Sequence, residues 1–181
     1  WSPRKLESQY QLIKNNKLDF VMSDYRVNNI IDNNTYDVSL DKFSIDFTKQ
    51  IIRSPGPFLQ CCLFTRTFIF DNLDNFDSLA EPSEDWDWFI SISKQPIKTN
   101  NINRILFEWN FSTDSQSSHL LNEANAIEYI INKHKNYILE KSNYQNLGFQ
   151  YRRLGGMFYK LDSFSKSKQY YNLAFQANPW S

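Results

Sequence analysis

The stretch "LDFVMSDYRV", Leu18 to Val27, decides the fold, because it is a short apolar run with polar segments on both sides. Such a run is typical of a buried β-strand. The turn-rich "NNIIDNNTYD", residues 28–37, follows it and predicts a connection that can form a hairpin. A strand at this point makes the first half of the chain an α/β structure, provided that helices flank it.

The segment before this strand, residues 2–16, reads as a helix. Ser2 is placed as its N-cap and Pro3 as its first helical residue, where the missing amide hydrogen costs nothing. An apolar stripe at helical spacing follows, made of Leu6, Tyr10 and Ile13. We expect this stripe to face the core.

The rest of the chain alternates between helix and strand as far as about residue 112, and only helices follow. Helices are predicted over residues 41–53, 65–73, 85–94 and 117–141, and strands over the first half of 58–70 and over 103–112. In the long helix of residues 117–141, one face carries Leu120, Ala124, Ile127 and Ile131. The order predicts an α/β layer followed by an α-helical appendage.

The C-terminal stretch, residues 151–179, has the spacing of a tetratricopeptide-like repeat. The matching positions are Tyr151, Leu154, Gly155, Phe158, Tyr171, Ala174 and Pro179. Gly155 allows two antiparallel helices to approach closely, and Pro179 ends the second helix. Ser167 stands where the motif usually has Ala. An unrelated helical hairpin gives the same pattern, and either alternative indicates interaction rather than chemistry.

Composition limits the classes of function. The chain has 181 residues, of which 41% are hydrophobic, and its 20 basic side chains balance 20 acidic ones. This balance argues against a dedicated nucleic-acid binder, which carries a basic face. No apolar stretch reaches the length of a transmembrane helix. Cys61 and Cys62 are adjacent, and in a strand they would point to opposite faces, so we expect no mutual disulfide and an intracellular protein.

The acidic stretch "EPSEDWDWF", Glu81 to Phe89, has two interpretations. In the simpler one, Ser83 caps a helix and the carboxylates of Glu84 and Asp85 oppose its dipole, with aromatic residues behind them in the core. In the other, the carboxylates are catalytic. The residues of this stretch alone favour the simpler interpretation.

Four segments occurring in order support the catalytic interpretation. They are "WSPRKLE" at 1–7, "LDFVMSDY" at 18–25, "CCLFTRTF" at 61–68 and "FDSLAEPSEDWDW" at 76–88. In order and spacing they resemble the family-two, inverting glycosyltransferases. The resemblance covers residues 1–135 and implies part of a type A, Rossmann-like glycosyltransferase domain, with residues 136–181 as the helical appendage.

The resemblance also implies the roles of particular residues. Asp85 corresponds to the catalytic base and Glu84 to its companion, while Trp86 and Trp1 are placed beside the substrate. The base takes a proton from the acceptor hydroxyl as that oxygen attacks the donor sugar. The donor would be a nucleotide sugar, and the acceptor a glycan, a lipid-linked carrier or a protein, as in polysaccharide biosynthesis.

The sequence departs from the family pattern in several places. "WFISISK" lacks the Arg that often follows the acidic pair, and Ser78 replaces an acidic residue. The nucleotide-binding half and the ligands of a divalent metal, Mg or Mn, would lie before Trp1, so we expect residues 1–181 alone to be inactive. His119 is a weak candidate for a metal ligand, and a solvent-exposed helix start is the plainer interpretation.

We therefore expect a cytoplasmic enzyme, or one attached to the cytoplasmic face of a membrane, in which the repeat can bind a protein partner. The alternative is a non-catalytic interaction module whose function resides in the C-terminal repeat.

Overall fold

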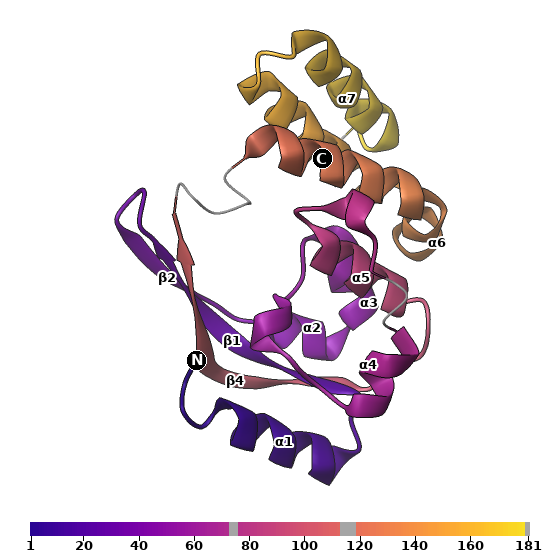
Figure 1. The fold of residues 1–181 in the computed structure, drawn as a ribbon. Coiled ribbons are helices and arrows are strands. Elements are labelled where there is room, and N and C mark those ends of the chain that lie inside the picture. Colours follow the sequence, from indigo (N-terminus) through magenta and orange to yellow (C-terminus); the bar gives the residue numbers. More distant parts are fainter. Residues whose placement is uncertain (73–75, 113–118, 180–181) are drawn as a thin grey trace.

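The computed structural model describes residues 1–72, 76–112 and 119–179 and has an α/β fold (Figure 1). Its sheet is centred on β1 (Phe20–Asn29), which pairs in parallel with β4 (Thr99–Phe111) over its whole length. Because β4 occupies one edge of β1, the antiparallel strands β2 (Asn34–Val38) and β3 (Leu63–Phe64) share the other edge. The strand predicted over 18–27, its hairpin and the strand over 103–112 are confirmed.

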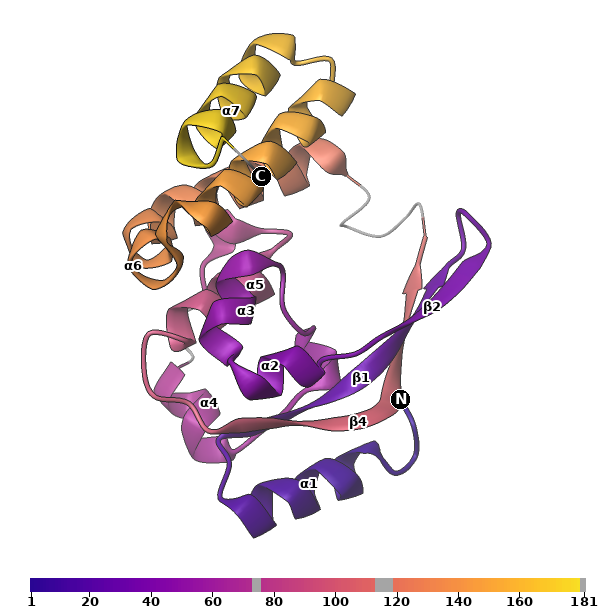
Figure 2. The same ribbon diagram turned by 180° about the vertical axis from the view of Figure 1, so that it is seen from behind.

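Helices cover both faces of this mixed sheet. α1 (Lys5–Asn16) lies against one face, and the helices between β2 and β4 lie on the other (Figures 1 and 2). These are α2 (Asp41–Ile45), α3 (Phe47–Arg53), α4 (Arg66–Asn72) and α5 (Glu84–Ile92), with short 3-10 turns η1 (Leu59–Cys61) and η3 (Ser78–Ala80) between them. The helix predicted over 65–73 matches α4, although residue 73 lies outside the described residues.

The helix predicted over 41–53 forms in two pieces. Asp46 interrupts it with an extended backbone, φ −149° and ψ 86°, and its side chain accepts a hydrogen bond from the Lys49 amide at 2.9 Å. Asp46 thereby caps α3. α3 ends at Arg53, immediately before the Ser54-Pro55 breaker, as predicted.

The buried face of α1 is polar, which corrects the predicted apolar stripe. Leu6 and Tyr10 are 52% and 55% exposed, whereas Lys5 and Gln9 are buried. Gln9 Nε2 donates to the carbonyl oxygens of Val21 and Cys61, at 3.2 and 2.8 Å. The helix therefore docks through side-chain hydrogen bonds to backbone carbonyls of β1 and of the segment at Cys61.

The N-terminus of α1 also differs from its prediction. The capping position is Arg4, and no side chain caps the helix. Ser2 instead anchors the chain to the sheet, because its amide donates to the Leu106 carbonyl at 2.9 Å, and its own carbonyl accepts from the Lys5 amide.

The two cysteines do not lie in a strand, so the expected placement on opposite faces was wrong. Cys61 ends η1 and Cys62 follows it, and both side chains are buried. Both are free thiols, and each Sγ donates to the Phe58 carbonyl oxygen. Burial raises the pKa of the Cys62 thiol well above its ordinary value, which makes it unreactive.

The C-terminal region consists of α6 (Leu120–Lys160) and α7 (Phe164–Ala177). α6 folds back on itself: Arg153 Nη2 lies 2.9 Å from Glu123 Oε1, although thirty residues of straight helix would separate them by about 45 Å. We call the part of α6 that carries Glu123 the first arm and the part that carries Arg153 the second arm. Figures 1 and 2 show α6 reversing direction between them. The helix predicted over 117–141 matches the first arm; residues 117 and 118 lie outside the described part. The boundary after residue 135 falls within α6.

The second arm of α6 and α7 form the predicted helical hairpin. Gly155 lies against the ring of Tyr171, where an added Cβ would be 3.1 Å from ring carbons. Ser167 Oγ donates to the Gly155 carbonyl at 2.9 Å, so the serine at this position ties the two helices together. α7 ends at Ala177, two residues before Pro179.

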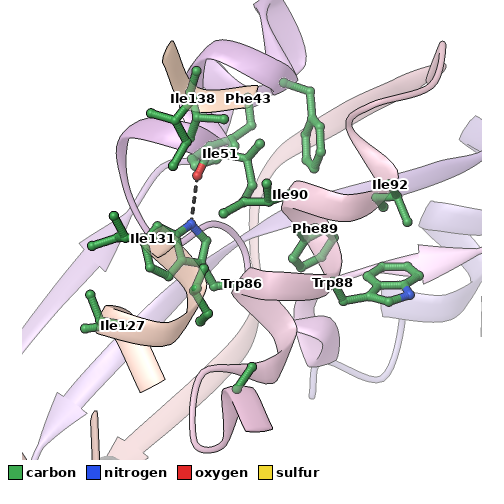
Figure 3. Packing of buried hydrophobic residues seen from close by; sticks show 14 of the residues in the cluster. Phe43, Ile51, Trp86, Trp88, Phe89, Ile90, Ile92, Ile127, Ile131 and Ile138 are labelled. Carbon is green, nitrogen blue, oxygen red and sulfur yellow. Dashed lines mark hydrogen bonds between the residues drawn. The ribbon is translucent and has the colours of Figure 1, made fainter. Parts of the chain in front are cut away.

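One buried cluster joins the sheet layer to the helical region (Figure 3). Trp86 of α5 is at its centre and donates Nε1 to the Ile51 carbonyl of α3 at 2.8 Å. From the first arm of α6, Ala124, Ile127 and Ile131 are buried in the same cluster. The apolar face predicted for this helix is therefore confirmed, and it packs on α3 and α5.

Candidate functional site

A cleft of about 490 Å³ opens where the start of α5 meets β4 and both arms of α6. Its walls come from five parts of the chain that are far apart in sequence. They are lined by Pro55, Phe58, Gln60, Pro82, Ser83, Glu84, Asp85, Trp86, Phe107, Trp109, Glu123 and Arg153. Both carboxylates that the sequence singled out are in this set.

Asp85 lies in the first turn of α5, where its Oδ1 accepts a hydrogen bond from the Trp86 amide at 2.8 Å. Burial raises its pKa from 3.8 to about 6; the neighbouring Glu84 adds to the increase and backbone hydrogen bonds oppose it. An Asp with this pKa is ionised at pH 7 and is a stronger base than an exposed carboxylate.

Glu84 faces the same cleft. Its Oε2 is buried and has no hydrogen-bond partner among the residues that the structure describes. A buried carboxylate oxygen without a partner costs free energy, so such atoms are found where a ligand or water completes them. The acidic pair therefore offers one proton-accepting group and one unused hydrogen-bond acceptor.

The two tryptophans named from the resemblance occupy different places. Trp86 lines the cleft, but it is only 1% exposed and serves the core, as its bond to α3 indicates. Trp1 is 67% exposed, does not line the cleft, and has Lys5 Nζ over its ring at 4.7 Å from the centroid. The structure thus brings Trp86, Glu84 and Asp85 together, without Trp1.

The aromatic wall of the cleft comes from residues that sequence reasoning missed. Phe107 and Trp109 are two apart in β4 and so point to the same face. The ring of Phe58 lies 4.7 Å from that of Trp109, centroid to centroid, at 54°. All three are half-buried, so each leaves part of its surface open to the cleft. The alternation of apolar and polar residues over 107–111 was the signal for a shared face.

Arg153 of the second arm of α6 closes the opposite side. It forms an ion pair with Glu123 of the first arm at 2.9 Å, and its guanidinium carbon lies 5.9 Å from the centre of the Trp86 ring. Its Nη1 is buried and has no hydrogen-bond partner within the described residues. Burial lowers the pKa of Arg153, and Glu123 partly offsets this. Nothing in the sequence predicts that α6 turns back, so neither residue was a candidate.

A buried polar network holds α5 behind the cleft. Asp87 is fully buried and accepts from Lys133 Nζ at 2.7 Å and pairs with His134 Nε2 at 2.8 Å. Lys133 also pairs with Asp77 at 2.8 Å, and Tyr129 donates its hydroxyl to the same carboxylate. His134, which had no assigned role, thus has a structural one.

The described residues do not suit a resident metal ion. No group of three or more His, Cys, Asp or Glu side chains is placed to hold one within residues 1–72, 76–112 and 119–179. His119 lines a small hollow with Glu81, Pro82 and Asn122.

Over the described part of the chain, no helix combines the length and the apolar character needed to cross a membrane. No family model matches the chain, and no curated protein or solved structure is significantly similar to it.

Proposed function

We propose that this chain is the acceptor-side part of an inverting glycosyltransferase, with Asp85 as its general base. The observation that carries the proposal is the position of Asp85. A carboxylate with a raised pKa lines an aromatic cleft, at the place in the sequence where the four-segment resemblance puts the base. A cytoplasmic location is part of the same proposal.

In the proposed reaction, the cleft binds the acceptor, orients one of its hydroxyls and removes the proton of that hydroxyl. An acceptor sugar binds against the aromatic wall, and one hydroxyl hydrogen-bonds to the Asp85 carboxylate. Asp85 removes that proton while the hydroxyl oxygen attacks the sugar carbon of the donor, and the bond to the nucleoside diphosphate breaks on the opposite side. Inversion at the sugar carbon follows from this direction of attack.

Each feature of the site has a part in this mechanism. The partly dehydrated surroundings of Asp85 raise its basicity without protonating it at pH 7. The hydrogen bond from the Trp86 amide fixes one carboxylate oxygen. A divalent metal, Mg or Mn, would neutralise the leaving diphosphate, and by the resemblance its ligands lie outside residues 1–181.

The test is transfer from nucleotide sugars in the longest natural form of the protein. We expect Asp85→Asn, which keeps the shape of the side chain, to lower the rate constant of transfer by about 10²- to 10⁴-fold, and to change KM little. Asp71→Asn is the matched control, because it removes an exposed carboxylate of α4 that does not line the cleft. Equal rates for Asp85→Asn and wild type would contradict the proposal.

A second candidate function is protein binding by the helical hairpin. A hollow of about 390 Å³ lies on the second arm of α6, lined by Phe149, Arg152, Arg153, Gly156, Met157 and Lys160. Three of these residues are basic, and Phe149 is 44% exposed, so an acidic and apolar segment of a partner would complement it.

This candidate is tested with two baits, the whole chain and its Phe149→Asp variant. The substitution is at an exposed position outside the buried core, removes the apolar ring and adds a negative charge that repels an acidic partner. A partner retained by wild type and lost from the variant supports the candidate. Recovery of the same proteins with both baits counts against it.

A further inference from the structure

The charges in the cleft restrict what the acceptor can be. Three carboxylates line it, those of Glu84, Asp85 and Glu123, against one cation, Arg153, which is already paired with Glu123. At pH 7 the formal charge of the cleft is therefore negative. A phosphate or carboxylate on the bound molecule would be repelled, because like charges in a partly dehydrated site interact strongly.

The polar atoms left without partners point to hydroxyl groups. Glu84 Oε2 is a buried acceptor and Arg153 Nη1 a buried donor, and neither has a partner among the described residues. One hydroxyl of a ligand can donate to Glu84 Oε2, and another can accept from Arg153 Nη1. A carboxylate placed there instead can accept from Arg153 Nη1, but it has no proton to donate to Glu84 Oε2.

The aromatic wall suits the apolar face of a sugar ring. Phe58, Phe107 and Trp109 are half-buried and line the cleft opposite Arg153 on α6. Partly exposed aromatic rings beside a few convergent polar groups are the usual lining of a small-molecule site. A pyranose has C–H groups for this wall and hydroxyls for the polar side.

We infer that the cleft binds an uncharged hexose unit of the acceptor, held between Trp109 and the two polar side chains Glu84 and Arg153, and that it excludes acidic and phosphorylated sugars. The inference rests on the proposed function and names its acceptor class. It also makes α6 part of the substrate site, because Arg153 and Glu123 come from its two arms.

Ligand-observed NMR with the whole chain tests this without requiring transfer. The probes are the methyl glycosides of glucose, galactose, mannose and N-acetylglucosamine, together with glucuronic acid, galacturonic acid, glucose 6-phosphate and mannose 6-phosphate. We expect at least one neutral glycoside to bind, and to bind at least fivefold more tightly than the acidic sugar with the same ring. Binding of none of the probes, or preference for an acidic one, overturns the inference.

Variants place the bound sugar in the cleft. Trp109→Ala and Arg153→Gln are each expected to weaken binding at least fivefold. Arg152→Gln, which removes the neighbouring arginine outside the cleft, is expected to leave binding unchanged. Thermal melting checks that each variant folds. If Arg153→Gln does not fold, Arg153→Lys keeps the charge but loses the second nitrogen, and the same weakening is expected. Unchanged binding by Trp109→Ala overturns the inference.

The results separate the inference from the proposed reaction. Binding of a neutral glycoside with no Asp85-dependent transfer contradicts the reaction alone. Asp85-dependent transfer to a uronic acid acceptor contradicts the inference alone.

Discussion

Besides its proposed role as the general base, the charged carboxylate of Asp85 lowers the stability of the folded protein. Its carboxylate is ionised at pH 7 in a setting that raises its pKa to about 6, so the folded protein holds the charge unfavourably. Glu84 Oε2 and Arg153 Nη1 are buried without partners among the described residues and add to this cost. Unfavourable groups gathered in one cleft are expected of a ligand site, where the bound molecule relieves them.

The first prediction concerns this cost. Between about pH 4 and pH 6 the folded state retains the Asp85 proton that the unfolded chain has lost. The free energy of unfolding therefore falls as the pH rises from about 4 to about 6. Asp85→Asn removes the ionisation and should raise the free energy of unfolding at pH 7.5 by about 1 to 2 kcal/mol. Urea unfolding at pH 7.5 and pH 4 measures it. A gain of the same size at both pH values would contradict the assigned pKa.

At the residue scale, the sequence singled out two adjacent carboxylates that line the cleft, but it did not reveal a pair of residues that depends on the fold. Glu84 and Asp85 are recognisable because they are adjacent at a helix start. Arg153 and Glu123 meet only because α6 reverses, and no local pattern encodes that contact. Trp86 was read as a substrate contact, and its indole serves mainly the core.

At the scale of elements, apolar periodicity was a sufficient guide to most helices and strands, because burial on one face follows the repeat of each element. α1 is the exception. Its buried face carries Lys5 and Gln9 because the neighbouring segment at Cys61 and Cys62 presents carbonyl oxygens. This requirement is set by another part of the chain, so the hydrophobic pattern of residues 5–16 could not reveal it.

The second prediction tests this polar docking. Gln9→Ala removes two donors to buried carbonyls and the acceptor for Lys5 Nζ, and should lower the free energy of unfolding by about 2 to 4 kcal/mol. Tyr10→Ala, at the adjacent and 55% exposed position, should change it by less than about 0.5 kcal/mol. Urea unfolding compares them. A larger loss of unfolding free energy for Tyr10→Ala than for Gln9→Ala would contradict the polar docking and support the predicted apolar face.

At the scale of the whole molecule, the helical region and the sheet layer share one core and one cleft. Trp86 and the first arm of α6 belong to the same buried cluster, and Arg153 of the second arm completes the wall opposite β4. The α/β class and the helical appendage were both predictable from element order. The packing of the helical region against the sheet layer was not predictable, because it depends on the reversal of α6.

The third prediction concerns the buried polar network that connects α5 to α6. Asp87→Asn removes a fully buried charge that pairs with Lys133 and His134, and should cost about 3 kcal/mol of unfolding free energy. Asp77→Asn, at the partly exposed end of the network, should cost clearly less unfolding free energy than Asp87→Asn, because solvent screens its ion pair. Thermal or urea unfolding measures both. Equal losses of unfolding free energy in the two variants would contradict the central place of Asp87 in this network.

The most direct test of the central claim is the pH dependence of sugar transfer by wild type and Asp85→Asn. If Asp85 removes the acceptor proton, kcat/KM of the wild type should rise tenfold per pH unit below about pH 6 and level off above it. The variant should keep only a small residual rate, without that ionisation. A variant that retains both the rate and the same pH profile would contradict the account.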